Sequence, residues 1–94
     1  MKRYVIERDL PGAGSLTAEQ LRDASQISNG VIRDLGVGIQ WVQSFVTADR
    51  IYCVYLAESE QLVREHAKRA GLPASSVSEV MQVIDPLTAM PQRV

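Results

Sequence analysis

Three observations in the amino-acid sequence predict a single α+β domain. The chain has 94 residues, which is at the lower end of the size of one domain. Two of its segments repeat apolar residues at helical spacing. Four short runs rich in β-branched and aromatic residues are placed around them in the order β-α-β-β-α-β.

The first strand and the first helix are separated by a glycine-rich loop. Residues 2–8 form a short β-branched and aromatic run that ends before Pro11, and residues 11–15 hold one proline and two glycines. Thr17 and Gln20 have the spacing of a capping box, which predicts the start of a helix. Apolar residues at spacings of three and four continue to Leu35, and Gly36 then predicts the helix end.

A β-hairpin is predicted in the middle of the chain. Residues 39–46 and 51–56 are dense in Val, Ile, Trp, Phe and Tyr, and residues 47–50 connect them. An even loop pairs Val46 with Ile51, Ser44 with Cys53 and Val42 with Tyr55 on one side of the sheet. A three-residue loop would instead turn one strand over relative to the other.

The second half of the chain predicts one more helix and one more strand. Ser59 caps a helix that ends before Gly71, and its apolar face includes Val63 and His66. The last strand spans residues 77–84, and residues 87–94 form a short flexible tail after a domain that covers residues 1–86.

This order of elements is the ferredoxin-like arrangement, in which two helices cover one face of a four-stranded antiparallel sheet. Both faces of the hairpin carry apolar residues, and Val46 and Ile51 are expected on the face without helices. A chain of this size cannot cover two apolar faces by itself. We therefore expect a homodimer of the dimeric α+β barrel type, in which the uncovered faces meet.

Composition excludes several classes of function. The net charge is −1, so no basic surface for nucleic acid or an anionic membrane is expected. The chain has neither a signal-peptide core nor an apolar run long enough to span a membrane, which predicts a cytoplasmic protein. Gly12-Ala13-Gly14 does not continue to the third glycine of a dinucleotide fingerprint. The chain has one histidine and one cysteine, and Cys53 falls within a predicted strand, so nucleophilic catalysis is disfavoured.

A metal site is the remaining chemical candidate. Cys53 and His66 offer a sulfur and a nitrogen ligand, and Glu7 and Asp9 offer oxygens. Each of these residues also has an ordinary structural role, because lone cysteines and histidines usually pack in cores. A dimer would double the number of donors and make a shared site chemically feasible.

Four segments resemble a family of small bacterial ferredoxin-like domains of unknown function that is labelled nickel-binding. The segments are Tyr4–Gly12, Ile39–Val46, Tyr52–Ala57 and Val63–Ala67. The resemblance covers roughly residues 3–86 and implies a dimeric ferredoxin-like fold and nickel or another divalent transition metal as the cofactor. The matching positions with ligand chemistry are His66, Glu7, Cys53 and Tyr55, which we take as the candidate metal ligands.

Three hypotheses follow. The first is a small dimeric protein that binds a divalent metal or a small ligand between sheet and helices. The sequence favours this binding role over that of an enzyme. The second is a dimeric α+β barrel enzyme of the small monooxygenase or isomerase type, whose pocket Trp41, Tyr52, Tyr55 and His66 would line. The third is a purely structural interaction module.

Overall fold

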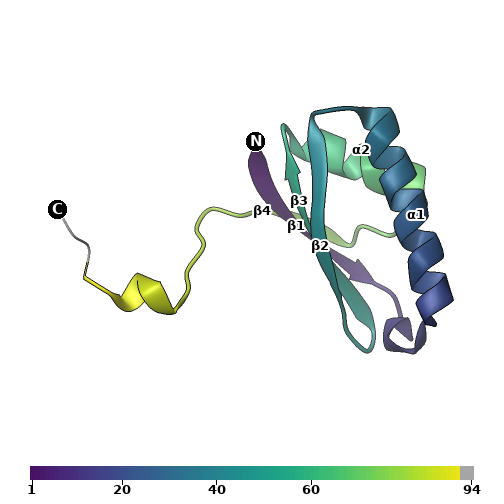
Figure 1. Ribbon diagram of the computed structural model, residues 1–94, viewed down its shortest axis with the longest axis horizontal. Helices are drawn as coiled ribbons and strands as arrows, with labels where there is room; N and C mark the ends of the chain where they lie inside the picture. The colour runs from purple at the N-terminus through teal and green to yellow at the C-terminus, as the bar shows by residue number, and fades with distance from the viewer. Residues whose placement is uncertain (92–94) are drawn as a thin grey trace.

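The computed structural model describes residues 1–91 and has the predicted order of elements (Figure 1). The strands and helices are β1 (Lys2–Asp9), α1 (Ala18–Leu35), β2 (Ile39–Val46), β3 (Arg50–Ala57), α2 (Glu60–Ala70) and β4 (Ser76–Glu79). Short 3₁₀ helices η1 (Ala13–Ser15) and η2 (Pro86–Ala89) lie after β1 and in the C-terminal segment.

The four strands form one antiparallel sheet in the order β2-β3-β1-β4. Both helices lie on the same side of this sheet, and the other side has no helix (Figure 1). This arrangement confirms the predicted α+β, ferredoxin-like fold.

Local sequence signals fix the helix boundaries. The Thr17 side chain accepts a hydrogen bond from the Gln20 backbone N–H, and the Gln20 side chain accepts one from the Thr17 backbone N–H. At the start of α2 the Ser59 side chain accepts a hydrogen bond from the Leu62 backbone N–H. Gly71 ends α2 with a φ of 70°, a left-handed conformation that glycine adopts without a steric penalty.

The hairpin has the predicted pairs at its tip but a different register farther along. Val46 pairs with Ile51 and Ser44 with Cys53, whereas Tyr55 pairs with Trp41 and not with Val42. A β-bulge between Trp41 and Gln43 is the reason, because the extra residue turns the side chains before it to the opposite face. Trp41 therefore shares the face of Tyr55, on the helix side of the sheet.

The hydrophobic core lies between the sheet and the helices. Alternate residues of β1 and β3 face it, and they pack with residues of β2 and α2. The buried members of this cluster are Tyr4, Ile6, Ile39, Cys53, Tyr55, Ala57 and Val63. The partly buried Ile51 packs against them, so the expectation that Val46 and Ile51 lie on the uncovered face is wrong.

The uncovered face carries the other set of alternating residues. Val5 pairs with Val54 and Phe45 with Tyr52. All four side chains point to the face opposite to that of the core residues. Phe45 is 52% exposed. A sheet face of this composition is typical of a surface that meets another apolar surface.

The last strand is shorter than predicted. It covers Ser76–Glu79 instead of residues 77–84, and the backbone N–H of Val80 donates to the carbonyl of Arg3 in a final bond to β1. Continued in this antiparallel register, Met81 and Gln82 would lie opposite Lys2 and Met1, so residues 83–84 of the predicted strand have no residue of the N-terminal strand to pair with. The segment then extends away from the sheet (Figure 1), and residues 92–94 of the predicted tail lie outside the described residues. No helix among residues 1–91 is long and apolar enough to cross a membrane.

Candidate functional site

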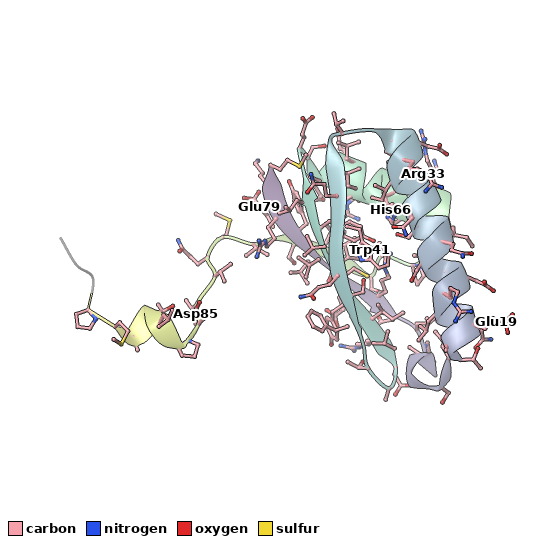
Figure 2. The ribbon with its side chains drawn as sticks, in the orientation of Figure 1. Glu19, Arg33, Trp41, His66, Glu79 and Asp85 are labelled. Carbon is pink, nitrogen blue, oxygen red and sulfur yellow. The ribbon has the colours of Figure 1, made fainter. Side chains whose placement is uncertain are left out.

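A cavity of about 90 Å³ lies between α1 and the helix-facing side of the sheet. Residues of α1, β2 and β3 form its walls, together with segments that follow β1 and α2. About half of these residues are aliphatic, and Trp41 from β2 adds an aromatic wall. Figure 2 shows Trp41 and His66 on the side of the sheet that faces α1. The predicted space between sheet and helices is therefore present.

Arg8 is the most unusual residue of this cavity. It follows Tyr4 and Ile6 on the same face of β1, so the alternation of the strand turns a guanidinium into the core, where Arg8 is only 1% exposed. The guanidinium donates from Nη1 to the Pro73 carbonyl at 2.6 Å, from Nε to Cys53 Sγ at 3.4 Å and from Nη2 to the Tyr55 hydroxyl at 3.4 Å.

His66 lies beside this group at the centre of α2 and has no exposed surface. Its Nε2 is 3.0 Å from the Ser28 hydroxyl of α1, and its ring centroid is 5.1 Å from that of Tyr55. Its Nδ1 is buried and has no hydrogen-bond partner among the described residues. Burial lowers the pKa of His66, and the charge of Arg8 acts in the same direction while the Ser28 contact opposes it. The imidazole is therefore neutral at neutral pH.

Tyr55 connects Arg8 and His66. Burial raises the pKa of its phenol, and the neighbouring Cys53 acts in the same direction while Arg8 opposes it. The phenol therefore stays protonated at physiological pH. It supplies a neutral acceptor to Arg8 rather than a counter-ion.

The structure brings together three of the four predicted metal ligands and separates the fourth. Cys53, Tyr55 and His66 lie on the helix side of the sheet, around Arg8. Glu7 has the opposite parity in β1 and forms an ion pair with Arg50 at 2.5 Å on the uncovered face. Asp9, the other oxygen donor considered, pairs with the same arginine at 3.0 Å.

The residues around His66 do not fit a nickel ion bound by one chain. The orphaned Nδ1 is a suitable nitrogen donor. However, residues 1–91 contain no group of three or more His, Cys, Asp or Glu side chains that could hold a metal ion. The Arg8 guanidinium also occupies the space beside Cys53 and Tyr55 and would repel a second cation.

Sequence reasoning missed Arg8 and Ser28. The signal for Arg8 was present, because Tyr4, Ile6 and Arg8 alternate, and the burial of Tyr4 and Ile6 requires the burial of Arg8. Ser28 is on the predicted apolar stripe of α1, but nothing in the sequence indicates that it meets His66, which is 38 positions away. Trp41 and Tyr55 line the cavity as expected, whereas Tyr52 faces the opposite side.

Residues 4–80 match a family model described as nickel responsive protein SCO4226-like. The chain belongs to this family. Its structure is similar to the crystal structure of SCO4226 from Streptomyces coelicolor A3(2), with a TM-score of 0.74 and 24% sequence identity. The similarity covers 87% of this chain and 99% of SCO4226. At this identity it supports the fold alone. No curated protein matches the sequence.

The name of the SCO4226-like family refers to nickel, and the match to its model ends at residue 80. That residue is also the last one bonded to β1 in the structure. The segment that extends away from the sheet therefore lies outside the part of the chain that the family model describes.

Proposed function

We propose that this protein is a homodimeric binding protein whose role depends on a divalent transition metal, with nickel as the first candidate. Membership of the nickel responsive family is the observation that carries the metal part of the proposal. Because one chain offers no cluster of three ligands among its described residues, we propose that donors from two chains complete the site.

The uncovered sheet face supports the dimer. Val5, Tyr52 and Val54 are only partly buried there, and Phe45 is about half exposed. A second copy that packs against this face would remove these side chains from water, at about 25 cal/mol for each Å² of apolar surface buried. A two-fold axis would place the same residues of both chains opposite one another.

The C-terminal segment gives a second reason to expect a partner copy. Residues 81–90 carry large apolar side chains that are between 64% and 78% exposed, namely Met81, Val83, Ile84, Leu87 and Met90. Asp85 nevertheless caps η2 through the Leu87 N–H, so part of the segment is ordered locally. An apolar segment of this kind is stabilised when it packs on a second chain.

The dimer is tested by light scattering of the full chain and of two variants. The wild-type protein should have about twice the 10.4 kDa of one chain. Phe45→Glu places a charge on the uncovered face, where it costs the isolated chain little but opposes association, and should give a monomer. Asn29→Glu adds the same charge on the exposed side of α1 and should remain a dimer. A monomeric wild-type protein would contradict the proposal.

The metal is tested by calorimetric titration of NiCl₂ into the same three proteins. Saturable binding by the wild type and by Asn29→Glu, but not by monomeric Phe45→Glu, is the result expected of ligands shared between chains. Equal binding by all three would place the site within one chain, and His66→Gln would then test the imidazole as a ligand. If the wild type does not bind above the level of MgCl₂, the metal proposal is wrong.

A further inference from the structure

Arg8 carries a buried positive charge without a counter-ion among the described residues. The ion pairs of residues 1–91 involve the surface residues Lys2, Arg50, Arg64 and Arg69 as cations, and none involves Arg8. The partners of Arg8 are a carbonyl oxygen, a sulfur and a protonated phenol. The charge is therefore solvated by dipoles alone.

Such an arrangement is costly for the fold. A charge that is removed from water without an ionic partner destabilises a protein by several kcal/mol unless other groups compensate. An apolar side chain of similar length would fill the same place without this cost. The presence of arginine at this position is thus better explained by something that binds to it than by packing.

Arg8 lines the cavity, and its guanidinium has hydrogen-bonding capacity that the described residues do not use. Arginine has five N–H donors, and the three observed bonds use one on Nε, one on Nη1 and one on Nη2. One N–H remains on each terminal nitrogen. Two N–H groups on the neighbouring terminal nitrogens of an arginine can donate to both oxygens of a carboxylate.

The rest of the cavity is suited to an apolar body. Leu10, Leu21, Ile51 and Leu72 contribute aliphatic surface, and Trp41 contributes an aromatic face. Besides Arg8 and its partners Cys53 and Tyr55, the polar side chains of the lining are Ser25, Ser28 and Ser44. A volume of about 90 Å³ is small beside the ligand sites of drug-sized molecules.

We propose that this cavity binds a small organic monocarboxylate, with its carboxylate on the Arg8 guanidinium and its apolar body between Trp41 and the aliphatic side chains of α1. One cation suits an anion of single charge, and the apolar walls disfavour a free phosphate, which would lose its hydration without replacement. The proposal rests on Arg8 and the lining of the cavity and does not require a bound metal.

The single tryptophan of the chain provides the assay. Trp41 lines the cavity, so its emission should change when a ligand enters. We would titrate the full chain with sodium hexanoate, 1-hexanol and inorganic phosphate at constant ionic strength. None of these probes absorbs light at the wavelengths that excite tryptophan. Hexanoate should bind saturably and at least tenfold more tightly than 1-hexanol, and phosphate should produce no change.

Two cavity variants and one control locate the site. Arg8→Met removes the charge and keeps most of the side-chain volume, so it should bind hexanoate at least tenfold more weakly and 1-hexanol about as well as the wild type. Ala24→Phe fills the cavity from its α1 wall, adds no second tryptophan and should block both probes without altering Arg8. Arg50→Met removes a cation of the uncovered face and should leave both affinities unchanged.

Several outcomes of these titrations would overturn the proposal. A wild-type protein that does not respond to hexanoate, or that prefers 1-hexanol, has no carboxylate site in this cavity. A response to phosphate equal to that of hexanoate would reduce the site to a general anion site. If Arg8→Met does not fold, unchanged hexanoate binding by Ala24→Phe would by itself show that the ligand binds elsewhere.

Discussion

The single histidine of the chain should make stability depend on pH in a defined range. His66 is fully buried, and burial lowers its pKa in the folded protein below the value of about 6.5 that it has when unfolded. The charged groups that face it do not offset this effect, because Arg8 is a cation and Tyr55 is neutral. Below pH 6.5 the unfolded chain therefore binds a proton that the folded chain does not.

The magnitude follows from linkage. Above about pH 6.5 both states hold a neutral imidazole, so the full stability is present there and is lost as the pH falls. Between pH 7.5 and pH 5.5 the free energy of unfolding should decrease by at most about 1.4 kcal/mol per chain, a factor of ten in the folding equilibrium constant. The loss stops once the pH reaches the pKa of the folded state.

Urea unfolding followed by Trp41 fluorescence measures this change. The titrations would be run with EDTA and at one protein concentration, because metals and oligomerisation also shift apparent stability. The urea midpoint of the wild type should decrease by about 0.5 to 1.4 M between the two pH values. His66→Gln, which can still bond Ser28, should lose this decrease. An equal decrease in the wild type and in the variant would refute the assignment.

Three further predictions concern the two helices and can be checked by the same unfolding experiment at pH 7.5. Thr17→Ala removes the hydroxyl that accepts from the Gln20 N–H, keeps the backbone N–H that donates to the Gln20 side chain, and should destabilise the protein by about 1 kcal/mol. Gly30→Ala places a methyl group where the nearest atom is 3.9 Å away inside α1 and should stabilise it by about 0.5 to 1 kcal/mol. Gly71→Ala also meets open space, but its φ of 70° makes it destabilising by about 1 to 2 kcal/mol. A stabilising Gly71→Ala would show that the end of α2 is not held in this conformation.

Local signals in the sequence were sufficient for the order of the elements and for most of their boundaries. Thr17, Ser59 and Gly71 act within one or two turns of the chain, so their effect does not depend on the rest of the fold. The density of β-branched and aromatic residues in β2 and β3 likewise predicted the hairpin, because a short loop leaves few other pairings.

The faces of the strands were decided only by the tertiary structure. One bulged residue in β2 moves Trp41 to the helix side, and the local sequence pattern does not predict an extra residue of this kind. The extent of β4 depends on its pairing with β1, which ends with Glu79 opposite Tyr4, 75 positions earlier in the chain, and so could not be predicted from the residues of β4 themselves.

The candidate site shows the same division. The sequence by itself determined that Cys53, Tyr55 and His66 belong to a β3-α2 unit that packs together. Only the pairing of β1 with β3 decided that Arg8, and not Glu7, faces this group. Neighbouring residues of a strand point to opposite faces, so a shift of one position exchanges a buried cation for an exposed carboxylate, and with it the kind of ligand that the site can bind.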